Sequence, residues 1–142
     1  MTQRDLETLA AGDCFDLLRQ ASIGRLVFVD EEGPVAVPVN YAIAGHEIVI
    51  RVEGGTKRAA MGQPMLAFEV DDIDGEEQSG WSVIARGIGR EVPIEDVPGL
   101  LQRLEGHPPR PWAEGIHNVW LAITPQRVTG RRLGAARASL LF

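Results

Sequence analysis

The sequence predicts a mainly β protein, a small β-barrel of six to seven mostly antiparallel strands with peripheral helices. Runs of β-branched and apolar residues recur along the chain. Glycine, proline and acidic residues divide these runs into lengths typical of single strands. With 142 residues and 44% hydrophobic side chains, the chain is expected to form one domain, residues 1–142, with a real core.

The first half of the chain predicts one helix followed by an antiparallel meander. Residues 1–12 are expected to be loose or partly helical, and Asp13 is a plausible N-cap for a helix that ends at Gly24. The apolar stripe of this helix has helical spacing at Cys14, Leu17, Leu18 and Ala21. Three strands with tight turns between them follow at residues 26–30, 35–44 and 47–52. Pro38 inside the second strand requires an edge position or a bulge.

The second half predicts more strands and two further helices. The strands are expected at residues 65–71, 81–92, 119–124 and 127–133. A short helix is expected near residues 56–61. An amphipathic helix is expected to start near Pro93, with its apolar face at Val97, Leu100, Leu101 and Leu104. The acidic stretch 71–80 and the proline-rich stretch 107–115 predict irregular segments, Gly87 and Gly89 predict a bend or bulge, and Pro125 begins a turn.

Composition excludes several classes of function. A net charge of −6 argues against general nucleic-acid binding, which requires a basic face. The single cysteine, Cys14, cannot form an internal disulfide and fits a reducing cytoplasm. The sequence has no secretory signal pattern, and no apolar run approaches the ~18 residues of a membrane span. We therefore expect a cytoplasmic protein with no membrane partner.

The segment from Gly54 to Arg58 predicts a phosphate site. It follows a buried strand and reads Gly54-Gly55-Thr56-Lys57-Arg58. The start of a helix offers unpaired N–H groups and the positive end of the helix dipole, and glycine lets a ligand approach the backbone. A hydroxyl and two cations at that point suit a phosphorylated cofactor, although an ordinary helix start with solvated charges has the same pattern.

Two strand segments carry weaker signals. In Gly80-Trp81-Ser82-Val83-Ile84-Ala85-Arg86, Ser82 and Arg86 share one face, so Ser82 could bond a ring edge and Arg86 could lie near an anion. A structural tryptophan with a rim charge explains the same pattern. Asn40 and Tyr41 are unusual in mid-strand and point to opposite faces, so only one side chain can line a given site. Tyr41 equally suits the core with its hydroxyl bonded.

Familiar catalytic motifs are missing from the sequence. The Gly54–Lys57 segment lacks the upstream glycine of a P-loop, and Gly87-Ile88-Gly89 is followed by Val92 where a dinucleotide-binding fingerprint needs glycine. The three histidines have no metal-ligand spacing. We therefore expect no metal site.

Taken in order, these segments resemble the pyridoxamine 5′-phosphate oxidase-like family, the split-barrel flavin-binding proteins, and are closest to its short bacterial members. The similarity covers nearly everything from Asp13 to Leu133. The matching segments are Cys14-Phe15-Asp16-Leu17-Leu18, Gly24-Arg25-Leu26, Pro38-Val39-Asn40-Tyr41, Ile48 to Arg51, Gly55-Thr56-Lys57, Gly80 to Gly87 and Val128-Thr129-Gly130-Arg131-Arg132.

The resemblance implies a homodimer of split barrels with FMN in a groove between the subunits. The family's phosphate site corresponds to Arg51, Thr56 and Lys57, with Arg58 beside them. The strand beside the flavin ring corresponds to Trp81, Ser82 and Val83, and another strand of the ring pocket to Asn40 and Tyr41. The apolar side chains expected to supply dimer surface lie late in the chain, at Trp112, Trp120 and residues 140–142.

The resemblance implies a flavin-dependent oxidoreductase acting on a small molecule, with no dedicated general acid or base. The tail, residues 134–142, has one arginine and no clear substrate-phosphate site, which argues against oxidation of pyridoxamine phosphate. Related split barrels bind a 5-deazaflavin coenzyme or heme. Lys57 is the only lysine, which favours FMN over the more acidic deazaflavin. A deazaflavin-dependent reductase and a non-enzymatic flavin-storage or sensor module stay open as alternatives.

Overall fold

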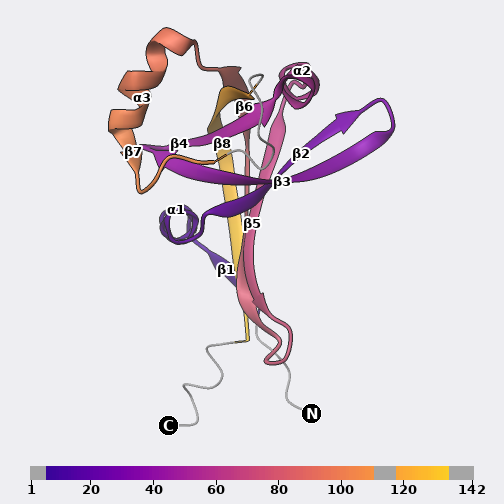
Figure 1. Cartoon of the computed structure of the whole chain (residues 1–142). Helices are drawn as coiled ribbons and strands as arrows, with labels where there is room; N and C mark the ends of the chain where they lie inside the picture. The colour runs from indigo at the N-terminus through magenta and orange to yellow at the C-terminus, as the bar shows by residue number, and fades with distance from the viewer. Residues whose placement is uncertain (1–5, 111–117, 135–142) are drawn as a thin grey trace.

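The computed structural model describes residues 6–110 and 118–134. Within these residues the chain forms eight strands, three α-helices and one short 3-10 helix (Figure 1). In chain order the elements are β1 (Leu6–Leu9), α1 (Ala11–Gln20), β2 (Ile23–Asp30), β3 (Gly33–Ala44), β4 (Glu47–Glu53), α2 (Gly54–Met61), β5 (Leu66–Asp74), β6 (Ser79–Glu91), the 3-10 helix Ile94–Asp96, α3 (Val97–Arg103), β7 (Leu104–Glu105) and β8 (Asn118–Leu133).

Six antiparallel strands close into a barrel in the order β8-β4-β3-β2-β5-β6, and β6 pairs with β8 to complete the ring. The two short strands are additions, with β1 on β8 and β7 on β3. The mainly β prediction and the β2–β3–β4 meander are confirmed. Pro38 lies where β3 pairs with β2 alone among the described strands, so its missing N–H interrupts no ladder there.

The seam between β6 and β8 contains the predicted irregularity. The register shifts between Arg86 and Gly87, and Gly87 lies opposite Pro125. A Cβ atom on Gly87 would lie 2.1 Å from the carbonyl oxygen of Thr124, so the close approach of the two strands requires glycine at this position. The bulge accommodates Pro125, so β8 continues as one strand where the sequence predicted two strands and a turn.

The barrel interior is the main core, and a second cluster lies outside it. Leu26, Ile50 and Phe68 are fully buried inside the barrel, together with the α1 residues Cys14 and Leu18. Burial raises the pKa of the Cys14 thiol, which fits the predicted core role. The second cluster lies on the outer face of β3, β4 and β8 and is covered by α3; its members are Ala44, Val49, Val92, Leu100 and Ala122.

Several local predictions were wrong. Helix α1 begins after its N-cap residue Ala10 and ends at Gln20, so Asp13 lies inside the helix and Gly24 belongs to β2. Residues 6–9 form a strand, because the long β8 extends beyond the barrel and offers them an edge. The acidic loop predicted at 71–80 is mostly a two-stranded ribbon, since β5 continues to Asp74 and β6 starts at Ser79. Helix α3 ends at Arg103, because Leu104 pairs with Ala44 of β3.

Candidate functional site

Helix α2 starts directly where β4 ends. Its first turn has no side-chain cap and no acidic residue to offset the helix dipole. Glu53 is the N-cap residue but makes no side-chain cap hydrogen bond, and the first turn contains no acidic residue. Among the described residues, the amide groups at Gly54, Gly55 and Thr56 therefore have neither an intrahelical partner nor a side-chain cap. Lys57 and Arg58 follow them, with Lys57 partly buried and Arg58 exposed. Within residues 6–110 and 118–134, the first turn of α2 thus presents unpaired amide donors next to two cations.

Arg51 lies beside this helix and contains an unsatisfied donor. Its Nε atom is buried and has no hydrogen-bond partner among the described residues. The guanidinium carbon lies 5.0 Å from the centre of the Trp120 ring, because Arg51 of β4 and Trp120 of β8 are register partners on the outer face of the barrel. A buried donor without a partner costs stability, and an anionic ligand at this position would remove that cost.

Lys57 has a carboxylate neighbour that a ligand would have to accommodate. Its Nζ atom lies 3.5 Å from Glu91 Oε2, and the side chains are 30% and 43% exposed. An ion pair this exposed contributes little to stability. A phosphate could therefore take over one or more of the three Nζ donors at small cost.

Asn40 and Tyr41 point in opposite directions, as alternation along a strand requires. Asn40 shares the outer face with Arg51, and its Nδ2 atom donates to the Arg110 carbonyl at 2.9 Å. Tyr41 is buried in the barrel, donates its hydroxyl to the Leu18 carbonyl and packs edge-on against Phe68. Burial also raises the pKa of Tyr41. The Tyr41 side chain is thus a core residue, and of the two side chains only Asn40 can face a ligand on the outer surface.

The predicted residues of β6 also divide between the core and the outer face. Val83 is fully buried in the core, so only its backbone is available to a ligand. Ser82 and Arg86 are half-buried on the outer face, opposite Arg131 and Arg127 of β8. Trp81 is also half-buried and packs against the main core. Trp81 and Ser82 help to line a shallow cavity of about 260 Å³, together with the exposed Leu6 and Ile73.

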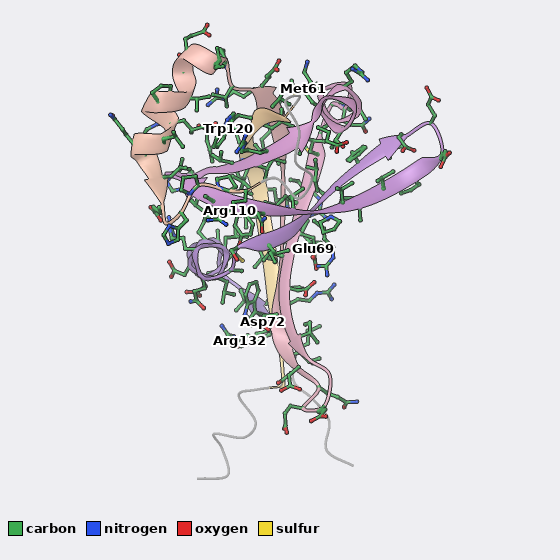
Figure 2. The ribbon with its side chains drawn as sticks, in the orientation of Figure 1. Met61, Glu69, Asp72, Arg110, Trp120 and Arg132 are labelled. Atoms are coloured by element: carbon green, nitrogen blue, oxygen red, sulfur yellow. The ribbon has the colours of Figure 1, made fainter. Side chains whose placement is uncertain are left out.

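The structure therefore brings the predicted residues together in two groups. One group lies at the α2 end of the barrel and contains Asn40, Arg51, Thr56, Lys57 and Arg58. The other lies on the ribbon formed by β5 and β6 and contains Trp81 and Ser82. Figure 2 shows Met61 and Trp120 near the α2 end, whereas Asp72 and Arg132, the register partners of Trp81, lie near the opposite end. Lys57 contacts Glu91, and Glu91 lies ten residue steps along β6 from Trp81. The two groups are therefore separated by about 33 Å of strand.

Sequence reasoning missed three residues at the α2 end. Glu91 reaches Lys57, Arg110 accepts from Asn40, and Trp120 packs on Arg51 within the same chain. All three depend on strand register or on a long connection, for which the sequence gives no local signal. The dimer surface predicted at Trp112 and residues 140–142 lies outside the described residues. Among residues 6–110 and 118–134, no group of His, Cys, Asp and Glu could hold a metal ion.

No helix in the described part of the chain is long and apolar enough to cross a membrane.

Comparisons with known proteins match this architecture. The solved structure of an FAD-binding protein from Mycobacterium smegmatis is 34% identical, with a TM-score of 0.70 over 89% of this chain and 98% of that one. An uncharacterised protein of Mycobacterium tuberculosis is 29% identical over 138 residues, 93% of this chain and 88% of its own length. An FAD-binding protein from Mesorhizobium loti, 21% identical, shares the fold with a TM-score of 0.72 over 93% of this chain and 99% of that one.

A family model described as pyridoxamine 5′-phosphate oxidase matches residues 10–132. Together with the closed six-stranded barrel, this match shows that the chain belongs to the pyridoxamine 5′-phosphate oxidase-like family of split-barrel proteins.

Proposed function

We propose that the protein binds a flavin through its 5′-phosphate at the start of α2 and acts as a flavin-dependent oxidoreductase on a small molecule. The observation that carries this proposal is the buried Nε atom of Arg51, which has no partner among the described residues and lies beside an uncapped helix start. Unpaired amides, a guanidinium and an ammonium together form the donor set that a phosphate monoester requires.

Each residue of this end has a distinct role in the proposed site. Arg51 donates from a position fixed by Trp120, so little side-chain freedom is lost on binding. The amides at the start of α2 donate along the helix axis, the Thr56 hydroxyl adds a donor, and Lys57 supplies a mobile charge. Arg58 is exposed and contributes at longer range. A dianionic phosphate therefore suits this site, because the first turn of α2 contains no carboxylate of its own.

The ring of the flavin would lie on the outer face beside Asn40. A cavity of about 350 Å³ opens there, lined by Ser22, Asn40, Tyr41 and residues 107–110. When bound, the flavin supplies the hydride or electron transfer itself. The chain orients the ring through Asn40, whose Oδ1 atom stays available while Nδ2 holds Arg110, and segment 107–110 limits the access of water.

The active unit is proposed to be a homodimer, with the cofactor in a groove between two copies. One FMN is too short to touch both Lys57 and Trp81 of a single chain, since about 33 Å of strand separates them. A second copy can bring its own Trp81, Ser82 and Arg86 to the first copy's α2 end. The outer face of β2 and β5 offers apolar surface for such contact, because Ile23, Val29 and Ile73 are 50%, 54% and 57% exposed.

The proposed cofactor is FMN, and FAD is the second candidate. The site at α2 recognises one phosphate, which FMN and the flavin half of FAD have in common. The similarity to the FAD-binding protein from Mycobacterium smegmatis, at 34% identity, is the specific reason to test the dinucleotide. Mass spectrometry of the ligand released from the denatured protein separates FMN, FAD and a 5-deazaflavin. Protein that is colourless and does not bind added FMN or FAD would contradict the proposal.

Mixed dimers test the shared groove. One chain has Arg51→Met with Lys57→Ala, the other has Ser82→Phe, and the two are co-expressed with different tags. Each variant alone is expected to bind little flavin. Random pairing gives a mixed dimer in roughly half of cases, each with one intact groove, so about a quarter of all sites should recover. No recovery in purified mixed dimers, or sedimentation of the wild type as a monomer, would contradict a groove built from two copies.

A further inference from the structure

The backbone of β2 has an open edge near its end, at Val29. Strand β2 continues to Asp30, but β5 pairs with it at residues 25–27 and no further. On its other side Val29 lies opposite Pro34 of β3, which has no N–H group to donate. Within residues 6–110 and 118–134, the N–H and C=O groups of Val29 therefore have no partner from a neighbouring strand. Peptide groups in this position need hydrogen bonds from elsewhere.

The side chain of Gln63, which follows α2, supplies both bonds. Its Oε1 atom accepts from the Val29 N–H at 3.4 Å, and its Nε2 atom donates to the Val29 carbonyl at 2.8 Å. A primary amide offers a donor and an acceptor side by side, as a peptide group does. Gln63 also donates from Nε2 to the Ala59 carbonyl at 3.3 Å and from its backbone N–H to the Ala60 carbonyl at 3.1 Å. One residue thus joins the last turn of α2 to β2, which lies beside it (Figure 1).

Helix α2 depends on contacts of this kind. It has eight residues, begins with two glycines and has no side-chain cap, and of its residues Ala60 alone is buried. A helix this short, with glycine in its first turn, is not stable by itself in water. The ion pair between Lys57 and Glu91 is too exposed to hold the helix in place. The position of α2 is therefore set by the burial of Ala60 and by the attachment of its last turn.

The proposed phosphate donors lie at the opposite end of this helix. Thr56 and Gln63 are seven residues apart, about 10 Å along a helix axis, so the Gln63 amide does not reach a phosphate at the first turn. The amides of residues 54–56 converge on one point only while α2 is formed and docked. The apparent affinity for a phosphate therefore falls in proportion to the fraction of molecules in which α2 has this conformation.

We propose that Gln63 is the positioning residue of the phosphate site. Its amide holds the last turn of α2 against Val29 and so keeps the first turn in the conformation that binds the flavin phosphate. This assignment rests on the proposed function, because it takes the start of α2 as the phosphate site. Gln63 acts through the helix, so its loss should weaken flavin binding and leave the surroundings of the bound ring unchanged.

Gln63→Met tests the role, because methionine keeps the length of the side chain and removes its hydrogen bonds. Hydrogen exchange at the amides of residues 58–61 in cofactor-free protein should accelerate about tenfold, the effect of one or two neutral hydrogen bonds. FMN affinity by fluorescence titration should fall three- to tenfold, with the absorption spectrum of bound FMN unchanged. Gln102→Met, at an exposed position of α3, is the matched control and should change neither quantity. Circular dichroism confirms that both variants are folded during the titrations.

A second substitution separates an effect through the helix from a direct contact. Gly62 has φ −77°, and a Cβ atom there would lie 3.6 Å from the carbonyl oxygens of Arg58 and Ala59, an ordinary contact. Gly62→Ala should therefore stabilise the end of α2 by restricting the unfolded chain. Added to Gln63→Met, it should slow the exchange of residues 58–61 and recover FMN affinity two- to threefold. Slower exchange without recovered affinity would contradict the positioning role.

The two proposals fail separately. A wild-type protein that binds neither FMN nor FAD contradicts the proposed function, whatever the exchange rates of α2. Protein that binds FMN equally well with Gln63 or Met at this position contradicts only the role of Gln63. Unchanged exchange at residues 58–61 in Gln63→Met would overturn that role as well, because the attachment to Val29 would then not hold the helix.

Discussion

Arg25 and Arg51 lie on the outer face of the same barrel in opposite states. Arg25 is half exposed, and its Nη1 atom donates to Glu69 at 2.9 Å and to Asp71 at 3.0 Å. Arg51 is more buried, lies over Trp120, and its Nε atom has no partner among the described residues. Arg25, whose charge water solvates more easily, has two carboxylate partners. Arg51, whose charge is harder to solvate, has a donor without a partner in the described part of the chain. The first arrangement is that of a structural ion pair, and the second is that of a site prepared for a ligand.

The ion pairs of Arg25 also change pKa values in the β2–β5 region. The hydrogen bond to Glu69 and the charge of Asp71 raise the pKa of Arg25. Burial, followed by the nearby Asp71, raises the pKa of the Glu69 carboxyl despite the opposing effect of Arg25. The β2–β5 region therefore contains an excess of negative charge, and the α2 end an excess of positive charge. An anionic cofactor would therefore be attracted to the α2 end.

The largest expected effect is that of Arg51→Met. Flavin affinity should fall by about 3 kcal/mol, the upper end for a hydrogen bond to a charged group. The stability of the cofactor-free protein should not fall, because the variant removes a buried unpaired donor and keeps an apolar stem against Trp120. Fluorescence titration and urea unfolding measure the two quantities. Arg103→Met is the matched control, because Arg103 is an exposed residue of α3 whose one described ion pair, with Glu47, is long at 3.8 Å. A loss of cofactor-free stability in Arg51→Met would make Arg51 structural like Arg25.

Lys57→Ala should weaken flavin binding by about 1.5–3 kcal/mol, for the same reason but with a more exposed group. Glu91→Gln should act in the opposite direction, because it removes the carboxylate that competes with the phosphate for Nζ. Isothermal titration with FMN gives both values. Equal FMN affinity in Lys57→Ala and wild type would remove Lys57 from the phosphate site.

Arg25→Met should leave flavin affinity per site unchanged and lower the unfolding temperature slightly. The change leaves Glu69 and Asp71 side by side without their shared cation. Differential scanning calorimetry at low and high salt measures the effect, which salt should reduce. A strong loss of flavin in dimeric Arg25→Met protein would mean that the two arginines do not have separate roles.

The smallest expected effect is a pH dependence from Glu69. Its folded-state pKa is raised, so the folded protein binds more protons than the unfolded chain between the unfolded value, about 4.3, and the folded value. This contribution is fully present below about pH 4.3 and is lost as the pH rises through the folded pKa. Glu69→Gln should flatten that decline in unfolding free energies measured by urea titration from pH 4 to 7. An unchanged slope would contradict the assignment.

Local features could be predicted from the sequence, whereas the contacts that distinguish Arg51 from Arg25 could not. Alternation and turns were sufficient for the barrel strands, and the segment from Gly54 to Arg58 was sufficient for the start of α2. The shared face of Ser82 and Arg86 followed from period two alone. The partners of Arg51, Lys57 and Asn40 did not follow, because Trp120, Glu91 and Arg110 are brought there by register and by a long connection. The ribbon at 71–80 was missed because its acidic residues have loop composition, while pairing with β6 decides their conformation.

Strand β8 is expected to dock last when the barrel folds. It pairs with β1, β4 and β6, and every one of these contacts joins it to a strand synthesised earlier. Contacts this distant in sequence are slow to form. Because Trp120 belongs to β8, the cradle around Arg51 does not exist until this strand has docked. Flavin uptake in a refolding experiment should therefore coincide with the final folding phase. The cofactor would then bind to the folded barrel and would not assist its folding.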